Sequence, residues 1–421
     1  MADLRPRRLS RVAVSQSEMG RKHRPDYWLV TFTVVLLVVG IVVVYAISPA
    51  LSISTGVSNN YYVTRQLLAV VLSVVAFIIT SQVPIERWRQ AYKPLLLMAA
   101  LATGLALVLP AAAQFPAHRW VRLGSLSFQS VELLKFAILI WLAGFLAARI
   151  RSGEVKDSRK TLKPLVIAVV VIGVIVAGVQ SDLGSAGVLV AMMATMAYVA
   201  GLPLKRIMLI GGIILIGLVL AISAVPYRRA RLMTYLHPAQ DCQTTGWQAC
   251  QALISIGSGG MIGLGLGRSI EAYGYLPEAA NDSIFAVFAE KFGFVGCAIL
   301  LGLFVAFFNR IKSIAVRAPD DFSRLVCMGV LSWLAVQAVI NIGAMVGLLP
   351  LKGITLPFVS YGGTSVIFSA AAIGLVFQIS RYTSHSIPKI REVKTGRDGH
   401  DHPFDGRRHR GAYHPNLSSS A

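Results

Sequence analysis

Long apolar runs of membrane-crossing length divide most of this chain. A helix needs about 20 apolar residues to cross the hydrocarbon core of a bilayer, where it must satisfy its own backbone groups. Such runs lie near 28–48, 64–82, 94–112, 131–149, 164–180, 184–202, 206–225, 284–308, 325–349 and 364–381. They predict an all-α fold class: a polytopic integral membrane protein with about ten transmembrane helices. The division between 164–180 and 184–202 is the least marked, because almost no loop separates them.

The charge distribution agrees with this class and orients the chain. Hydrophobic residues make up 55% of the sequence and charged residues 14%, which is far from an ordinary soluble domain. With a cytoplasmic N-terminus, 30 of the 40 Lys and Arg residues fall on the cytoplasmic side, as the positive-inside rule requires. The net charge of +21 is therefore spread over many short loops, a pattern that does not favour nucleic-acid binding.

The apolar runs define a membrane domain, residues 26–383, between two polar tails. Residues 1–25 and 384–421 are basic and poor in apolar side chains, so we expect both tails to be disordered and cytoplasmic. The segment 226–283, between the seventh and eighth runs, is expected to be a long extracellular loop. The first run is too long for the core of a cleavable signal peptide, so we expect it to remain as a spanning helix. Together the runs predict a multi-pass protein of the cytoplasmic (inner) membrane.

The four cysteines fall into two kinds. Cys297 and Cys327 lie in apolar runs and are expected to pack as small hydrophobic side chains. Cys242 and Cys250 lie in the long outer loop, where oxidising conditions permit a disulfide. A lone pair of this kind can also stay reduced, so the sequence leaves both states open.

An interrupted stretch, residues 341–365, carries the strongest signal of function. An apolar helix is predicted to break at Leu349–Pro350, and the backbone then turns through Gly353 and Pro357 before a new helix near Val366. Irregular backbone between spanning helices persists only where protein or water satisfies its polar groups. We therefore expect an ordered wall of a cavity at the membrane surface; an ordinary interhelical turn is the alternative.

Ionisable residues at the outer ends of the runs are the candidate functional groups. Glu132 and Lys135 are three residues apart and share one helix face. Charged groups in a membrane are costly and face a cavity or a partner. The two therefore line a cavity, or else they pair with each other or extend to the membrane interface. Asp182 starts a helix, where an N-cap role is favoured over a cavity role. Asp282, taken alone, also suggests a helix N-cap.

The stretch 341–365 resembles the C-terminal signature of the SEDS family, the membrane glycosyltransferases that include FtsW, RodA and SpoVE. The matching residues are Asn341, Gly343, Gly347, Leu348, Leu349, Pro350, Gly353, Leu356, Pro357, Phe358, Ser360, Tyr361, Gly362, Gly363, Thr364 and Ser365. A match this long and interrupted is specific. The version of the motif around Lys352 is more similar to FtsW than to RodA.

Three further segments resemble motifs of the same family. The first has the form W-x-x-x-G…Q-x-x-E-x-x-K and matches Trp120, Gly124, Gln129, Glu132 and Lys135, although Ser130 and Val131 replace a Pro-Ser pair. The second, Gln180–Gly184, is similar to the family's Q-P-D-L-G.

The third segment, Tyr275–Ala286, contains Asp282, which aligns with the aspartate proposed as catalytic in the family. Its surroundings depart from the family pattern. Ala280-Asn281 replaces His-Thr, Ser283 replaces Phe, and Lys291 replaces the second residue of a downstream Glu pair. The acid is retained, and the departures leave open a retuned or weakened enzyme.

The resemblance implies a peptidoglycan glycosyltransferase that polymerises lipid II during cell division. In this inverting transfer, the C4 hydroxyl of an acceptor GlcNAc attacks C1 of a donor MurNAc, and undecaprenyl pyrophosphate leaves. Asp282 is the candidate general base. Cations would stabilise the leaving group, and a divalent cation, Mg²⁺ or Mn²⁺, is a possible cofactor. The candidate substrate-binding residues are Trp120, Arg122, Glu132, Lys135, Asp182, Arg268, Lys352, Ser360 and Tyr361.

The implied partners are lipid II, lipid-linked glycan, a class B penicillin-binding protein (FtsI-like) and other divisome membrane proteins at the septum. Two other classes stay open. A lipid II flippase or transporter would need ionisable residues at mid-membrane depth in several helices. A non-catalytic division scaffold would tolerate the loss of Asp282.

Overall fold

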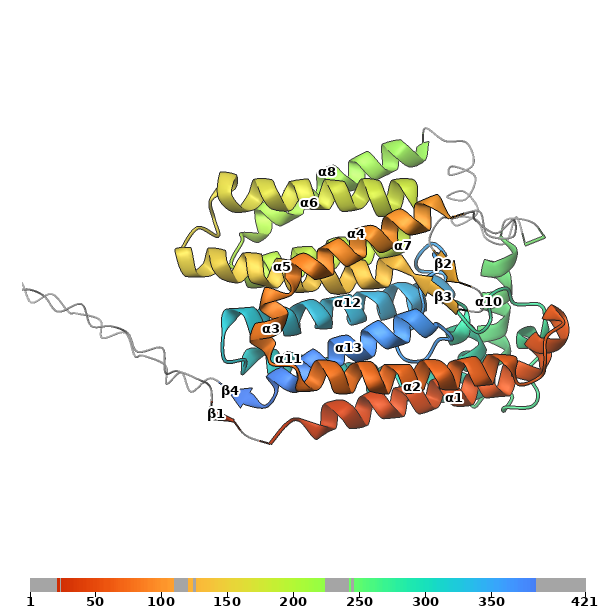
Figure 1. The fold of residues 1–421 in the computed structure, drawn as a ribbon. Coiled ribbons are helices and arrows are strands. Elements are labelled where there is room, and N and C mark those ends of the chain that lie inside the picture. The colour runs from red at the N-terminus through yellow and green to blue at the C-terminus, as the bar shows by residue number, and fades with distance from the viewer. Residues whose placement is uncertain are drawn as a thin grey trace, which may run out of the picture. The chain divides into compact units, whose positions relative to one another are not determined.

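The computed structural model describes residues 21–22, 24–109, 120–123, 126–223, 242–243 and 246–383. All of these lie in the first of two units, residues 1–385; residues 386–421 form the second. Figure 1 shows the helices of the first unit running side by side. Those that correspond to the ten predicted runs are α1 (Tyr27–Thr55), α2 (Tyr61–Gln82), α4 (Tyr92–Val108), α5 (Ser130–Ser152), a segment made of η1 (Ser158–Leu162), α6 (Lys163–Ile172) and η2 (Gly173–Val179), α7 (Leu183–Val199), α8 (Leu204–Ser223), α11 (Ile284–Val316), α12 (Asp321–Met345) and α13 (Gly363–Ile379).

The prediction of an all-α membrane fold is confirmed. Six of the described helical segments are long and apolar enough to cross a membrane by length and composition, and α4, α7 and α13 are shorter apolar helices. Strands in the described part are short. They form two antiparallel pairs: β1 (Arg21–Lys22) with β4 (Tyr382–Thr383), and β2 (Trp120–Leu123) with β3 (Leu126–Gln129).

The core lies around α5, α12 and α13, in the middle of the helical bundle (Figure 1). The membrane-length windows of α5 and α12 are 72% and 61% buried, against 17% for the segment that contains α6. Outer helices instead expose large apolar side chains such as Val71, Leu101 and Val170. Apolar exposure on this scale is unfavourable in water and favourable in lipid. The packing of the helices and the apolar composition therefore both indicate a membrane protein.

The end of α12 differs from the prediction. The helix was expected to break at Leu349–Pro350, but it ends at Met345. Gly347 adopts a positive φ of 76°, and the Leu348 N–H donates to the Gly343 carbonyl at 2.8 Å. This is the hydrogen bond of a Schellman C-cap, for which glycine is the favoured residue. The glycine, not the proline, therefore ends the helix.

The long loop predicted over 226–283 contains structure that the sequence did not indicate. Helix α10 (Trp247–Ser258) and the short η4 (Glu271–Tyr273) lie within it. A disulfide joins Cys242 to Cys250 at the start of α10, which settles the alternative that the sequence left open. Residues 224–241 and 244–245 lie outside the described residues. So do the predicted tails, 1–25 and 384–421, except for residues 21–22, which form β1, and 24–25.

Helix α11 is broken near its start, which the apolar run did not reveal. Gly293 has φ 64° and ψ −166°, and a glycine-rich turn after α10 crosses the helix there. The N–H of Leu264 donates to the Glu290 carbonyl at 2.9 Å, and the Phe294 N–H donates to the Gly260 carbonyl at 2.9 Å. The turn thus takes up backbone groups that the break releases, which meets the requirement for irregular backbone at membrane depth.

Glycine makes this close crossing possible. A Cβ on Gly263 would lie 2.2 Å from the Lys291 carbonyl oxygen, and Gly263 also has a positive φ of 81°. No other residue tolerates both conditions. The crossing fixes the loops that follow α10 against the first turns of α11, next to the candidate aspartate.

Candidate functional site

Two loops that each carry a predicted motif meet at one end of the bundle. We call residues 275–283, before α11, the aspartate loop, and residues 350–362, between α12 and α13, the proline loop. Asn341 of α12 joins them, because its side-chain amide donates to the backbone carbonyls of both Asp282 and Ile354 at 2.7 Å. We call this end of the bundle the site end.

Direct contacts between the two loops add to this link. The Ser360 hydroxyl donates to the Asn281 carbonyl at 2.6 Å and accepts from the Leu356 N–H at 2.7 Å. The Tyr361 N–H donates to the Ala280 carbonyl at 2.8 Å. The predicted residues Ser360 and Tyr361 therefore lie beside the aspartate, and both hold the backbone that carries it.

Asp282 is half-buried in the aspartate loop. Its Oδ1 lies 3.5 Å from Nε2 of Gln248, which also donates to the Ser283 hydroxyl at 3.1 Å. Burial, aided by the negative charge of Glu278, raises the pKa of Asp282 to about 7. The N-cap of α11 is Ser283, so the interpretation of Asp282 as a helix N-cap is wrong.

The turn before the aspartate loop is tied to the broken helix by two charged residues. Glu290 accepts from the Ser269 hydroxyl at 2.7 Å and from the Ile270 N–H at 2.6 Å. Lys291 donates to the Leu266 carbonyl at 3.0 Å. Lys291, one of the departures from the family motif, thus has a structural partner of its own.

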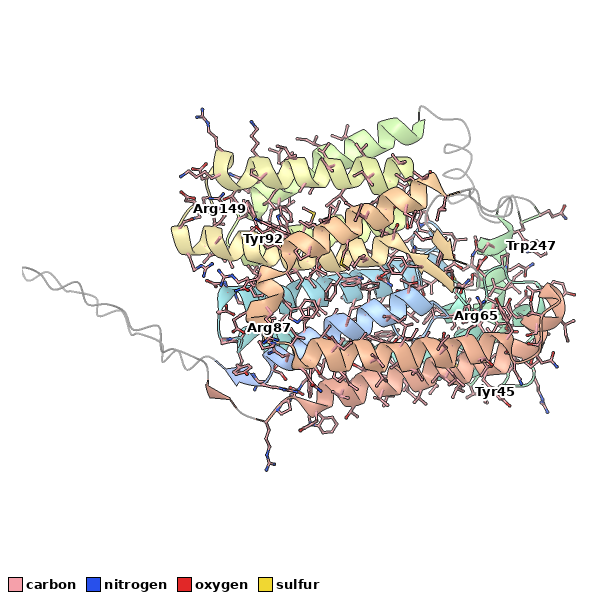
Figure 2. The ribbon with its side chains drawn as sticks, in the orientation of Figure 1. Tyr45, Arg65, Arg87, Tyr92, Arg149 and Trp247 are labelled. Carbon is pink, nitrogen blue, oxygen red and sulfur yellow. A yellow bond between two sulfur atoms is a disulfide. The ribbon has the colours of Figure 1, made fainter. Side chains whose placement is uncertain are left out.

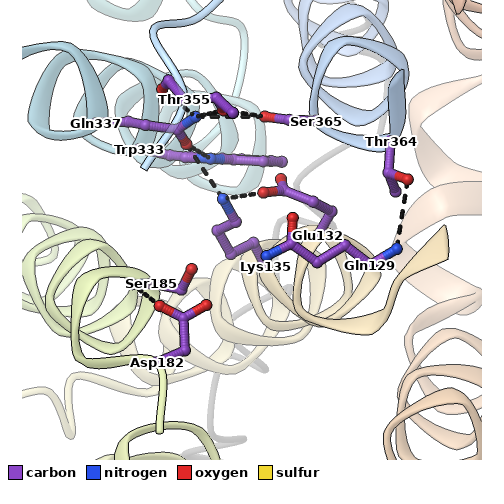
Figure 3. Close-up of polar contacts among 10 residues, drawn as sticks. All are labelled: Gln129, Glu132, Lys135, Asp182, Ser185, Trp333, Gln337, Thr355, Thr364 and Ser365. Atoms are coloured by element: carbon purple, nitrogen blue, oxygen red, sulfur yellow. Dashed lines mark hydrogen bonds and ion pairs between the residues drawn. The ribbon is translucent and has the colours of Figure 1, made fainter. Parts of the chain in front are cut away.

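A second polar centre lies within the bundle, between α5 and α12 (Figure 3). Lys135 Nζ lies 2.7 Å from Glu132 Oε1 and donates to Gln337 Oε1 at 3.1 Å. The ammonium also lies 5.1 Å from the ring centroid of Trp333. Lys135 is only 2% exposed. Of the alternatives that the sequence left open, the structure shows the one in which Glu132 and Lys135 pair with each other.

Gln337 connects this centre to the proline loop. Its amide nitrogen donates to the Thr355 carbonyl at 3.0 Å and lies 3.3 Å from the Ser365 hydroxyl (Figure 3). Gln337 and Asn341 are four residues apart and share one face of α12. One helix face therefore supports both polar centres. Gln337 and Gln248 were absent from the predicted set, although a lone amide in an apolar helix is a usable signal.

Asp182 is the N-cap of α7, as the sequence favoured. Its Oδ1 accepts from the Ser185 N–H at 3.0 Å, and the residue is 3% exposed. The start of α7 presses against the proline loop, since a Cβ on Gly184 would lie 2.6 Å from Ile354 and 3.2 Å from Lys352. The Cβ of Lys352 therefore lies beside the first turn of α7.

The remaining predicted residues lie in separate segments of the site end. Trp120 and Arg122 lie in β2, and the hairpin of β2 and β3 is attached to α13 where the Gln129 N–H donates to the Thr364 hydroxyl at 3.3 Å. The side chain of Arg122 lies outside the described part. Arg268 is exposed in the turn before η4. Neither Trp120 nor Arg268 is among the contacts of Asp282 given above for the described residues.

An aromatic and cationic cluster on α2 was not predicted. The ring of Tyr62 lies 5.4 Å from that of Tyr361, and the Arg65 guanidinium lies 4.5 Å from the ring centroid of Tyr61. Arg65 and Trp247 lie at the site end, whereas Arg87 and Arg149 lie at the other end (Figure 2). The cluster brings α2 into contact with the proline loop.

A metal site is not evident in the part of the chain that the structure describes. No group of three or more His, Cys, Asp or Glu side chains among those residues is arranged to hold a metal ion. The loops of the site end offer a half-buried carboxylate, Asp282, whose pKa is raised to about 7, with amide, hydroxyl and basic groups around it. Such a carboxylate can accept a proton at neutral pH.

Comparison with known proteins places this arrangement in context. The sequence profile of the FtsW/RodA/SpoVE family, described as cell cycle protein, matches residues 27–385. The chain is 34% identical to the stage V sporulation protein E of Bacillus subtilis, over 87% of the chain and 99% of that protein. It is 35% identical to the "Probable peptidoglycan glycosyltransferase FtsW" of Saccharophagus degradans, over 85% of the chain and 92% of that protein.

Solved structures of related proteins have a similar fold. One chain of a peptidoglycan synthase complex, described as coordinating polymerization and crosslinking, is similar with a TM-score of 0.71 and 27% identity. The match covers 85% of this chain and 98% of that one. The rod shape determining protein RodA of Thermus thermophilus is similar with a TM-score of 0.62 and 27% identity, over 85% of this chain and 97% of that one.

Proposed function

The chain belongs to the FtsW/RodA/SpoVE family, and we propose that its aspartate loop polymerises lipid II with Asp282 as the general base. The chain is a peptidoglycan glycosyltransferase, the activity in the names of several of its FtsW relatives. The observation that carries the assignment of the site is the junction of the aspartate loop and the proline loop. The contacts of Asn341 with the Asp282 carbonyl and of Ser360 with the Asn281 carbonyl support the proposal, because they join both motifs beside this half-buried carboxylate.

The proposed reaction forms one glycosidic bond and breaks one bond to phosphate. The C4 hydroxyl of an acceptor GlcNAc attacks C1 of a MurNAc that is linked to undecaprenyl pyrophosphate. Asp282 takes the hydroxyl proton, and the pyrophosphate leaves with the bonding electron pair, so the configuration at C1 inverts. A base with a pKa of about 7 suits this task, because it is partly ionised at neutral pH and still basic enough to accept the proton.

The departing pyrophosphate needs positive charge, because negative charge develops on its oxygens. Lys352 and Arg268 are the candidates with described positions in the loops of the site end, and Arg122 is a candidate from β2. Lys135 can contribute only if its pair with Glu132 opens, since the lysine is buried and already has an acidic and an amide partner. No step of the proposal passes through a metal ion.

The tyrosines where α2 contacts the proline loop suit a sugar substrate. Tyr62 and Tyr361 pack edge to face, and aromatic rings of this kind combine an apolar face with a polar tip. We propose that the cluster of Tyr61, Tyr62, Arg65 and Tyr361 lies beside the bound glycan. The lipid tails would remain in the bilayer, beside the exposed apolar faces of the outer helices.

The orientation and the partner are parts of the same proposal. The site end would face the outside of the cytoplasmic membrane, with both termini in the cytoplasm, because basic residues are concentrated in the opposite loops. Its similarity to a chain of a synthase complex supports a class B penicillin-binding protein as the partner. The septum is the proposed location, because several relatives are named FtsW.

Polymerisation of purified lipid II tests the proposal. The full chain, in detergent or in lipid discs, should lengthen glycan strands alone or with a cognate transpeptidase, and gel separation of labelled strands measures the product. Transport of lipid II without polymer would support a flippase. No product under either condition, from protein that is folded and binds its partner, would leave the scaffold interpretation.

A further inference from the structure

A cationic cavity lies at the end of the bundle opposite to the site end, where the chain enters α1 and leaves α13. Its volume is about 230 Å³. Among the described residues, three arginines line it, Arg24, Arg310 and Arg317, together with a single carboxylate, Asp26. The formal net charge of these lining groups is therefore +2, which favours an anionic occupant.

Two of the arginines, Arg310 and Arg317, are only partly compensated by the protein. Arg310 lies 2.6 Å from Asp26 through its Nε atom. Arg317 donates to the Ser313 hydroxyl at 2.7 Å and to the Ser313 carbonyl at 3.2 Å. Within the described residues, no carboxylate pairs with Arg317. A phosphate group accepts hydrogen bonds from the planar guanidinium in the same way as a carboxylate does.

An apolar groove of about 430 Å³ adjoins the cavity, and Arg310 lines both. The groove runs between the start of α1 and the last turns of α11, and Trp28, Phe32 and Ala306 form its apolar walls. Trp28 is 62% exposed and packs against Phe32 at 6.1 Å between ring centroids. Trp28 and Phe32 are four residues apart in α1, which corresponds to a rise of about 6 Å along the helix. The groove therefore leads from the end of the bundle toward its middle.

The cationic cavity and the apolar groove together suit an amphiphile, a molecule with a charged head and an apolar tail. Tryptophan in the first turn of a spanning helix is typical of the level where lipid headgroups begin. At this level the cavity offers cations, and the groove offers apolar contact that faces lipid. A soluble phosphate or nucleotide would use the cavity and leave the groove empty. Basic pockets between spanning helices are a known mode of binding for anionic lipid headgroups.

We propose that this paired cavity and groove bind an anionic diacyl phospholipid. The phosphate would lie between Arg310 and Arg317, and one acyl chain would lie along Trp28 and Phe32. The amide of Asn309, which also lines the groove, is placed to donate to the ester region. The proposal rests on the membrane-spanning fold and not on the glycosyltransferase function.

Native mass spectrometry of the full chain in detergent, titrated with phosphatidylglycerol or with phosphatidylcholine, tests the site. The parent should retain phosphatidylglycerol in preference to phosphatidylcholine. Arg317→Gln should weaken the binding of phosphatidylglycerol about fivefold, the effect expected for one basic side chain at an anionic lipid headgroup. Arg317→Lys should retain most of it, and Trp28→Ala should weaken the binding of both lipids because it removes a wall of the groove.

Lys312→Gln is the matched control, since Lys312 is an exposed cation of α11 that lines neither space. Equal losses for Lys312→Gln and Arg317→Gln would mean general surface attraction and would overturn the proposal. Displacement of the lipid by inorganic phosphate would show a site for free anions instead. If phosphatidylglycerol binds only after residues 386–421 are removed, the C-terminal segment is the occupant and the proposal is wrong.

Discussion

The aspartate loop and the Glu132–Lys135 pair are both polar centres supported by one face of α12, but they satisfy their charges differently. Lys135 is almost fully buried and has an acidic partner, an amide partner and a nearby ring. Asp282 is half-buried, and its carboxylate lies 3.5 Å from the amide of Gln248. The first centre has its charge neutralised within the protein. Among the residues that the structure describes, the carboxylate of the second centre contacts a neutral amide and pairs with no cation.

This difference separates a group that holds the fold from a group that can react. A buried ion pair is strongly destabilising only when one partner is removed. A carboxylate left without a cation is costly to ionise, and its raised pKa is typical of groups that transfer protons. The contrast supports the proposal that Asp282 carries the chemistry and that Glu132 and Lys135 support the loops, and mutations can test this division of roles.

The largest expected effect is that of Asp282→Asn on activity. The amide keeps the size of the side chain but is not a base, and loss of general-base catalysis typically costs about 10²- to 10⁴-fold. The rate of polymerisation with purified lipid II is the measurement. Asp320→Asn is the matched control, because Asp320 is the N-cap of α12 at its other end and should not affect the rate. Parent-like polymerisation by Asp282→Asn would exclude the aspartate as the base.

The same variant should not lose stability. Asp282 has a folded-state pKa of about 7, above the ordinary value of about 3.9. Ionisation therefore destabilises the folded protein as the pH rises from about 4 to about 7, and the penalty is complete above that range. An uncharged amide at this position carries no such penalty. Relative to the parent, Asp282→Asn should gain thermal stability between about pH 5 and about pH 8.

The second prediction tests the other centre. Lys135→Met leaves Glu132 buried without its cation, which typically costs about 3–5 kcal/mol. A lower unfolding temperature and loss of polymerisation are both expected. The double variant Glu132→Gln with Lys135→Met removes both charges and should recover most of the stability. Thermal unfolding in detergent, followed by fluorescence, measures both.

Activity of the folded double variant then decides the role of the pair. Polymerisation near the parent rate would assign Glu132 and Lys135 to support of the proline loop through Gln337. A folded but inactive double variant would break the comparison. It would mean that Lys135 leaves its partner during the reaction and contacts the pyrophosphate, as the family resemblance first implied.

A third prediction concerns the crossing that positions the aspartate loop. Gly263→Ala would place a Cβ 2.2 Å from the Lys291 carbonyl oxygen, and Gly265→Ala would meet nothing within 4 Å. Both glycines have positive φ, 81° and 88°, so the strain of that conformation is shared. Overpacking typically costs about 1–3 kcal/mol, so Gly263→Ala should be the less stable by about that amount. Equal unfolding temperatures for the two variants would show that the crossing adjusts easily.

The spanning helices were predictable because each is encoded locally. An apolar run of sufficient length leaves the backbone little choice in lipid, and even Gln180 to Asp182, the shortest division, separates η2 from α7 as expected. The break in α11 was not predictable. It depends on Gly263 and Gly293, which are distant in sequence and meet only through the backbone hydrogen bonds of the crossing.

The site also combines features that local sequence predicts with features that depend on distant residues. Asp282, Ser360 and Tyr361 were found through motifs, and the structure brings their segments together. Gln337 and Gln248 were missed because their importance comes from partners on other elements. The sequence left open whether Lys135 pairs with Glu132, and the structure shows that it does. Spacing shows which residues share a helix face, but not which of them find a partner across the bundle.

The smallest expected effect is a shift in pH dependence. Glu278 is an exposed residue of the aspartate loop, and its negative charge contributes, after burial, to the raised pKa of Asp282. Glu278→Gln removes this repulsion and should lower that pKa, because the charged aspartate becomes easier to form. The acid limb of the rate profile should move to lower pH, by less than about one unit for an exposed charge.

The measurement is polymerisation rate against pH for the parent and for Glu278→Gln, at low and at high salt. High salt screens exposed charges, so it should move the acid limb of the parent toward that of the variant and leave the variant almost unchanged. Glu271→Gln is the control, since Glu271 is a carboxylate of η4 that does not contribute to the pKa of Asp282. A shift of equal size in both variants would show that the limb does not report Asp282. The contrast between the reactive and the supporting centre would then lose its electrostatic basis, because Asp282 would no longer be the group whose ionisation limits the rate.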